Sequence, residues 1–88
     1  MARFELVFKR SVAKDLRRIP NQDVARILAR VDTLRNNPRP GDAKKLSESE
    51  RYRLRQGVYC ILYEIEDARL VVTVVQMGHR REQVYRRP

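Results

Sequence analysis

The sequence predicts an α+β fold, a twisted, mainly antiparallel sheet of about four strands with two N-terminal helices packed on one face. Three observations lead to this prediction. Polarity alternates over residues 4–8, an apolar stripe at helical spacing runs over residues 24–34, and three strand-like runs fill residues 51–77. Because the helices come early and most strands late, we expect the helices to share one face of the sheet. The other face is then free to bind a partner.

The first strand and first helix follow from local patterns. Phe4, Leu6 and Phe8 alternate with the residues between them, which is typical of a strand with one apolar face. Ser11 is a candidate N-cap, and apolar residues follow it at helical spacing: Val12, Leu16 and Ile19. Pro20 ends this helix, because proline removes a backbone donor.

The second helix has the clearest periodicity. Asn21 is a candidate N-cap, and Asp23 suits the positive end of the helix dipole. The predicted apolar stripe consists of Val24, Ile27, Leu28, Val31 and Leu34. The helix is expected to end near Asn36, before Pro38. Residues 37–50 contain Pro and Gly breakers and are predicted to be a loop.

Three strands are predicted after this loop, over residues 51–56, 58–66 and 69–77, with a tight turn at Asp67-Ala68. Their short connections predict an antiparallel meander. In the first of them, Tyr52 and Leu54 are expected to anchor the strand in the core.

Size and charge limit the classes of function. The 88 residues are expected to form one domain, residues 1–88, with a net charge of +9 and a pI of about 10.6. Such a pI favours nucleic-acid binding, because neutralised phosphates release counterions. An acidic protein segment would respond to the same field. We expect no membrane partner and a cytoplasmic location, because no apolar stretch is long enough to span a bilayer.

The sequence contains no motif typical of a metal site or of a nucleotide-binding loop. There is one cysteine, Cys60, and one histidine, His79, so a structural zinc site is not expected. The carboxylates near the C-terminal half are scattered, and no Gly-rich phosphate loop occurs. A nuclease built on this chain is therefore expected to work without a metal or other cofactor.

Basic and proton-carrying side chains gather at two places. Arg53 and Arg55 are two residues apart on one predicted strand, so they point to the same side. Arg80 follows the last strand, and Tyr85 can stack on a base or carry a proton if nearby guanidinium groups lower its pKa from about 10. His79 is the only side chain whose unperturbed pKa is near neutral. The alternatives are a solvated edge strand, a basic terminus and a tyrosine that covers the core.

Several short motifs stand in a distinctive order along nearly the whole chain: Asn37-Pro38, Lys45-Leu46, Tyr52-Arg53-Leu54-Arg55, Gly57-Val58-Tyr59, Leu62-Tyr63-Glu64-Ile65, Gly78-His79-Arg80-Arg81 and Val84-Tyr85. Together with the element order strand, helix, helix, three strands, they resemble the RelE/ParE superfamily of type II toxins. The C-terminal motifs are most similar to those of RelE-type toxins.

The resemblance implies an mRNA endonuclease that acts in the ribosomal A site and inhibits translation, with the ribose 2′-OH attacking the adjacent phosphate without metal. It implies that Arg53 and Arg55 hold the phosphate, that Arg80 stabilises transition-state charge, and that Tyr85 contacts the substrate. The residues expected to bind RNA around them are Lys44, Lys45, Arg51, His79 and Arg81. The implied partners are a RelB-like antitoxin, the ribosome with its mRNA, and operator DNA bound by the toxin–antitoxin complex.

One departure from the family pattern leaves alternatives open. Many RelE toxins have an arginine where this chain has Cys60, and Arg51 or Arg81 is a candidate substitute. Arginines also replace lysines that often serve as acid and base, and arginine hardly deprotonates, which shifts proton transfer toward Tyr85 or His79. The second hypothesis for the function is a ParE-like inhibitor of DNA gyrase. The third hypothesis is a catalytically inert toxin relative that only binds antitoxin and operator DNA.

Overall fold

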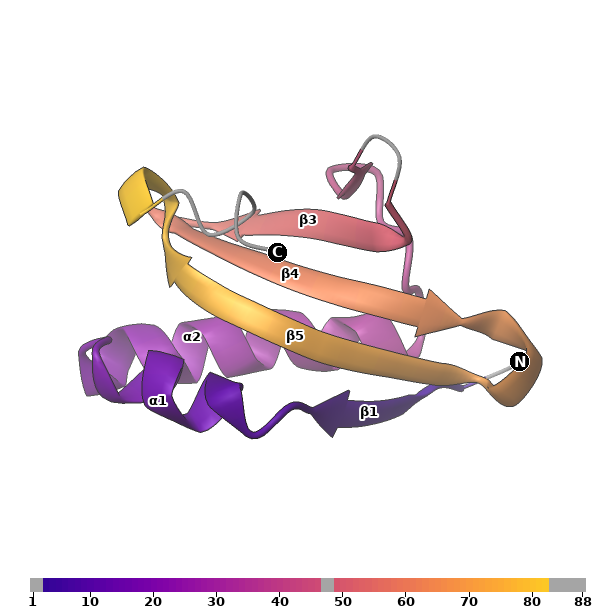
Figure 1. Cartoon of the computed structure of the whole chain (residues 1–88), viewed down its shortest axis with the longest axis horizontal. Helices are drawn as coiled ribbons and strands as arrows, with labels where there is room; N and C mark the ends of the chain where they lie inside the picture. Colours follow the sequence, from indigo (N-terminus) through magenta and orange to yellow (C-terminus); the bar gives the residue numbers. More distant parts are fainter. Residues whose placement is uncertain (1–2, 47–48, 83–88) are drawn as a thin grey trace.

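The computed structural model describes residues 3–46 and 49–82. Within these ranges the chain forms two α-helices and five strands in the predicted order (Figure 1). The elements are β1 (Glu5–Phe8), α1 (Ser11–Arg17), α2 (Asn21–Asp32), β2 (Lys44–Lys45), β3 (Arg51–Gln56), β4 (Tyr59–Glu66) and β5 (Val71–His79). Three short 3-10 turns complete them: η1 (Thr33–Arg35), η2 (Asp67–Arg69) and η3 (Arg80–Glu82).

The strands form one sheet in the order β1-β5-β4-β3-β2. β3, β4 and β5 are the predicted antiparallel meander, and β2 adds to it antiparallel to β3. β1 pairs with β5 in parallel, because the two helices carry the chain across before it returns. The α+β fold with a mainly antiparallel sheet is thus confirmed.

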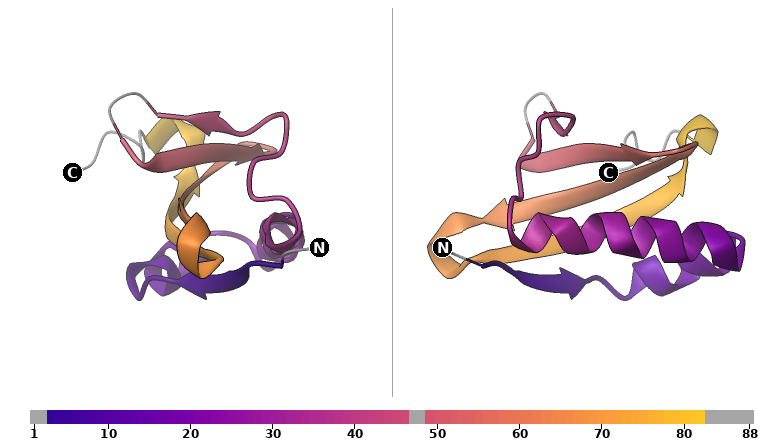
Figure 2. Two further views of the ribbon diagram at one scale, coloured as in Figure 1. Left: turned by 90° about the vertical axis from the view of Figure 1, so that its right-hand side faces the viewer. Right: turned by 180° about the vertical axis from the view of Figure 1, so that it is seen from behind.

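The helices and the sheet share one hydrophobic core. α2 runs along the back of the sheet as seen in Figure 1, and Figure 2 shows it from that side. Fully buried residues of this core come from both layers: Val12, Ile27, Val31 and Leu34 from the helices and η1, and Leu54, Ile61, Tyr63, Val72 and Val74 from the strands. Tyr52 packs against the same cluster, as its spacing from Leu54 predicts. None of the helices in the described ranges is long and apolar enough to cross a membrane.

The ends of the helices differ from the predictions. Ser11 and Asn21 open the first turns of their helices, and the cap positions belong to Arg10 and Pro20, neither of which makes a side-chain cap hydrogen bond. α2 ends at Asp32 and continues as the 3-10 turn η1. The predicted loop 37–50 contains β2, whose two lysines pair with β3 through backbone groups and so carry no apolar alternation.

The predicted stripe on α2 was wrong at one position. Leu28 retains 37% of its surface, whereas the neighbouring Ile27 retains none. One residue is a rotation of about 100° along a helix, so Leu28 lies at the solvent side of the stripe. The predicted tight turn at Asp67-Ala68 is η2, and Leu70 leaves it with a positive φ of 54°.

The difference in burial between Ile27 and Leu28 allows a matched pair of substitutions that tests the core. We expect Ile27→Ala to lower the free energy of unfolding by about 2–5 kcal/mol, because it leaves a cavity in a close-packed core. Leu28→Ala is the control on the same helix and should change the unfolding free energy by no more than about 0.5 kcal/mol. Urea unfolding measures both, and equal effects would contradict the packing described here.

Candidate nucleic-acid interface

The cross-strand register divides the predicted site residues between the two faces of the sheet. In an antiparallel pair, residues directly opposite each other point to the same side. Arg53 lies opposite Leu62 on β4 and Lys44 on β2, and Arg55 lies opposite Cys60. Their neighbours Tyr52 and Leu54 belong to the helix-side core. Lys44, Arg51, Arg53 and Arg55 therefore stand on the face away from the helices, which we call the open face.

The cations of the open face differ in their surroundings. Arg51 Nε lies 3.3 Å from Glu64 Oε2, and the Arg51 backbone N–H donates to Ser49 Oγ at 3.1 Å. Arg51 is thus engaged with a carboxylate of the opposite strand. Across residues 3–46 and 49–82, by contrast, Lys44 and Arg55 form no ion pair, and both are exposed. These two side chains are available to an anionic ligand.

A small apolar cluster lies between the cations of the open face. Leu62 is fully buried and packs with Val75 and Leu46. A β-bulge at Leu62/Tyr63 in the pairing of β4 with β5 leaves Val75 without a Cα partner, and it packs against Leu62. Cys60, the position where the sequence departs from the family pattern, is also fully buried. Buried apolar groups beside arginines lower the local dielectric, which strengthens an arginine–phosphate contact.

The segment after β5 is tied to the β3–β4 hairpin. The backbone N–H of Arg80 donates to the carbonyl of Val58 at 2.8 Å, which places Arg80 at the same end of the sheet as Arg55. The Arg80 and Arg81 side chains are exposed. Tyr85, the remaining predicted catalytic residue, lies outside the described residues.

Two predicted RNA-binding residues stand apart from the open face. His79 lies opposite Tyr59, and their rings meet edge to face with centroids 6.0 Å apart. Tyr59 points toward α2, where its hydroxyl donates to Asp23 Oδ2 at 2.9 Å. The Arg81 N–H donates to His79 Nδ1 at 3.1 Å. Lys45 lies opposite Tyr52 and shares that side as well.

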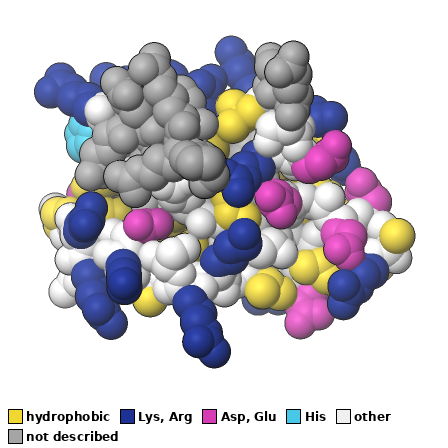
Figure 3. Space-filling view, in the orientation of Figure 1, with side chains coloured by type: hydrophobic (Ala, Val, Ile, Leu, Met, Phe, Trp, Pro, Cys, Tyr) yellow, Lys and Arg dark blue, Asp and Glu magenta, His cyan; other side chains and the backbone are white. Residues whose placement is uncertain are grey.

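On the face seen in Figure 3, charge is unevenly distributed. Figure 3 shows Lys and Arg side chains over much of one view, with several Asp and Glu side chains toward the end where β4 turns into β5.

No group of three or more potential metal ligands occurs in the part of the chain that the structure describes.

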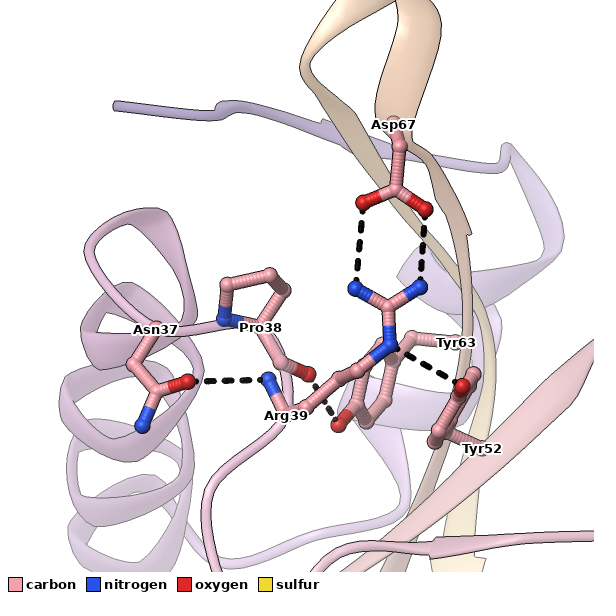
Figure 4. A network of polar contacts seen from close by, with 6 residues as sticks. All are labelled: Asn37, Pro38, Arg39, Tyr52, Tyr63 and Asp67. Carbon is pink, nitrogen blue, oxygen red and sulfur yellow. Dashed lines mark hydrogen bonds and ion pairs between the residues drawn. The ribbon is translucent and has the colours of Figure 1, made fainter. Parts of the chain in front are cut away.

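Sequence reasoning missed a clamp that holds the loop after η1 against β3 and the β4–β5 turn (Figure 4). Arg39 binds both oxygens of Asp67 at 3.0 and 2.8 Å and donates through Nε to the Tyr52 hydroxyl at 3.0 Å. Tyr52 stacks on Tyr63, and the Tyr63 hydroxyl donates to the Pro38 carbonyl at 2.7 Å. The clamp thus fixes Tyr52, the residue between Arg51 and Arg53 on β3.

The clamp shifts the ionisation of its members. Hydrogen bonds from Arg39 lower the pKa of Asp67, and the same contacts raise the pKa of Arg39. Burial raises the pKa of Tyr63, which keeps its hydroxyl protonated as the donor to Pro38. The only sequence signal for this clamp is the Pro-Arg-Pro run at residues 38–40, which marks a loop without naming its partners.

Comparison with known proteins shows the family to which the chain belongs. Residues 6–84 match the family model for the ParE toxin of the type II toxin–antitoxin system parDE. The chain is a member of the RelE/ParE superfamily of type II toxins. The toxin is also 30% identical over 91 residues to a Methanocaldococcus jannaschii protein that carries the name toxin RelE1, covering 98% of this chain and 99% of that relative.

Solved structures show the same fold. The RelE–RelB complex of Pyrococcus horikoshii contains a chain 26% identical to this toxin, with a TM-score of 0.79 and coverage of 91% of this chain and 97% of that one. The RelBE2 toxin–antitoxin complex of Mycobacterium tuberculosis has a chain with a TM-score of 0.80 at 23% identity, covering 89% of this toxin and 99% of that chain.

The clamp gives a pH-dependent expectation. The pKa of Asp67 is lower in the folded toxin than its unfolded value of about 3.9, so its stabilising effect is complete above that value. It is lost as the pH falls through the lowered folded-state pKa. We therefore expect Asp67→Asn to lower the melting temperature at pH 7, and this difference from the parent toxin to shrink as the pH falls below about 4.

Glu5→Gln is the matched control for this comparison, because Glu5 is exposed on β1, outside the clamp. It should show no such pH-dependent difference. A melting-temperature difference for Asp67→Asn that is the same at pH 7 and pH 2–3 would contradict the ion-pair interpretation.

Proposed function

We propose that the toxin is a metal-independent endoribonuclease that cleaves mRNA on the ribosome and thereby inhibits translation. The observation that supports this most is the open face. Arg53, Arg55 and Lys44 project from it, and the backbone of Arg80 is fixed at its end. Phosphate is the ligand that such a group of cations suits best, and arginine can bind it with two parallel hydrogen bonds.

The chemistry assigned to these residues is electrostatic. The ribose 2′ oxygen bonds to the adjacent phosphorus, the bond to the 5′ oxygen breaks, the 2′ proton is lost and the departing oxygen gains one. Arg53 and Arg55 would hold the phosphate oxygens so that the attack is in line. Arg80 would meet the negative charge that develops in the transition state. Because arginine stays protonated, these residues do not supply the base.

The proton carrier is proposed to be Tyr85. Guanidinium groups of the open face would favour its phenolate form and so assist proton transfer. His79 is the less suitable carrier, because its ring packs against Tyr59 on the helix side and its Nδ1 accepts a backbone hydrogen bond.

The partners follow from the same surface. We propose that a RelB-like antitoxin with an acidic segment neutralises the toxin, as charge complementarity to a net charge of +9 favours. The ribosome and its mRNA would be the targets in the cytoplasm, and operator DNA would bind the toxin–antitoxin complex. The P. horikoshii structure is itself a complex of RelE with RelB.

A second candidate is inhibition of DNA gyrase, which the match to a ParE toxin model favours. This function requires binding alone, and mapping of mRNA ends in a translating extract separates the two. Cuts within codons support the endonuclease, whereas intact mRNA with poisoned gyrase supports the inhibitor. A toxin relative that only binds antitoxin and operator DNA would do neither.

Substitutions of the cations test the proposed chemistry. We expect Arg55→Ala and Arg80→Ala each to slow single-turnover cleavage on programmed ribosomes by about 10²–10³-fold, the typical cost of one electrostatic donor at a transition state. Binding to the ribosome should change little, because each is one of 20 Lys and Arg residues. Arg17→Ala on α1 is the control and should cleave at the parent rate. Near-parent rates for both site variants would refute the catalytic assignment.

The role of Tyr85 is tested by a separate pair. If its hydroxyl carries a proton, Tyr85→Phe should slow the same single-turnover reaction by roughly 10²–10⁴-fold. If the ring only stacks on a base, Phe should preserve the rate and Ala should not. His79→Gln should cleave at nearly the parent rate, and a large loss in that variant would return the proton transfer to His79.

A further inference from the structure

A pocket at one end of the sheet is separate from the open face. Its volume is about 220 Å³, and its lining comes from α2 and the β3–β4 hairpin: Asp23, Arg26, Gln56, Gly57, Val58 and Tyr59. Pockets that bury drug-sized ligands have volumes of roughly 300–1,000 Å³, so this one suits a single small group. None of its lining residues has a part in the phosphate chemistry proposed above.

The wall formed by α2 carries both a charged acceptor and a charged donor. Asp23 accepts one hydrogen bond from the Tyr59 hydroxyl at 2.9 Å, and a carboxylate has further lone pairs to offer. Arg26 is exposed and stands three residues later on the same face of the helix. Asp23 disfavours a simple anion and Arg26 a simple cation. A neutral group with donors and acceptors along one edge satisfies both.

The wall formed by the hairpin contains the apolar Val58 and the ring of Tyr59 beside the polar Gln56. Gln56 pairs with Tyr59 across a two-residue turn, in which Gly57 has a φ of +60° that glycine adopts readily. Val58 is 42% exposed, and Tyr59 adds an aromatic ring. An apolar and aromatic wall beside hydrogen-bonding groups is the usual setting for an unpaired nucleobase.

The pocket adjoins the proposed phosphate contacts. Arg55 directly precedes Gln56 on β3, and the Arg80 N–H donates to the Val58 carbonyl at 2.8 Å. The hairpin therefore carries the pocket on one side and is joined to both cations on the other. An RNA strand whose phosphate lies at Arg55 and Arg80 would pass around the turn at Gly57 and Val58 to bring an adjacent base into the pocket.

We infer that this pocket receives an unpaired RNA base that has an exocyclic amino group, next to the phosphate held by Arg55 and Arg80. This inference rests on the proposed function. Guanine is such a base, because its amino group donates and its O6 and N7 atoms accept. Asp23 accepts from the amino group, and Arg26 donates to O6 or N7. Uracil has no amino group to offer Asp23.

Binding of mononucleotides to the isolated full-length toxin tests the inference without a ribosome. We expect GMP to bind roughly tenfold or more tightly than UMP, which is a usual discrimination for one two-point contact to a base. Backbone amide shifts in an NMR titration should change at Gly57 and Tyr59 with GMP. Inorganic phosphate should change only the shifts around Arg55 and Arg80.

Matched variants test whether Asp23 and Arg26 give the toxin its preference for GMP over UMP. Asp23→Asn and Arg26→Gln should each bring the GMP and UMP affinities close together. Asp32→Asn is the same substitution about 13 Å further along α2, outside the pocket, and should keep the parent preference. Arg26 is exposed, so Arg26→Gln keeps the test decisive if Asp23→Asn fails to fold.

Equal affinities for GMP and UMP, or shifts confined to the open face with every probe, would overturn the inference. So would hairpin shifts that an antitoxin peptide produces and GMP does not, because the pocket would then belong to the antitoxin. A toxin that binds GMP in the pocket but leaves mRNA intact supports the base site and refutes only the endonuclease. A toxin that cleaves mRNA with the same sites before and after Asp23→Asn refutes the base site and leaves the endonuclease standing.

Discussion

The pairing register of β3 with β4 is the constraint on which the rest of the structure depends. Side chains alternate along a strand, so a slip of one residue would exchange the two faces of β3. Arg53 and Arg55 would then turn into the helix-side core, and Leu54 would turn to solvent. Burying two arginines without partners would cost far more than the domain could offset. The same register that fills the core therefore also presents the cations.

Contacts at both ends of β3 hold this register. At one end, Tyr52 stacks on Tyr63 and accepts a hydrogen bond from Arg39, which is itself bound to Asp67. At the other end, the tight hairpin at Gly57 fixes which residues of β3 and β4 face each other. Because Arg80 is hydrogen-bonded to that hairpin, the position of the chain after β5 depends on it as well.

Much of the fold could be predicted from the sequence, because it follows from local periodicity. The alternation at Tyr52 and Leu54 predicts both the strand and its orientation, and the α2 stripe predicts the helix. Contacts that depend on chain segments far apart could not be predicted. Arg39 and Asp67 are 28 residues apart, and neither sits in a periodic pattern. The residues lining the hairpin pocket belong to α2 and the β3–β4 hairpin, which only the folded chain brings together.

In the candidate site too, local periodicity predicts some features and only the folded structure shows the others. Spacing alone places Arg53 and Arg55 on one side of a strand, and the structure adds that this side faces away from the helices. His79 adjoins Arg80 in sequence, yet its side chain packs against Tyr59 on the other side. β5 ends at His79 and Arg80 begins the turn η3, so nearness in sequence says little about a shared site.

The open face is proposed to hold the reacting phosphate. A structure of the toxin on a ribosome programmed with mRNA that lacks the attacking 2′-OH tests it most directly, because binding is retained while cleavage is blocked. We expect the scissile phosphate to lie within hydrogen-bonding distance of the Arg55 and Arg80 guanidinium groups. A toxin bound with its helices or its β1 edge against the mRNA, and with the open face turned away from it, would contradict this role of the open face.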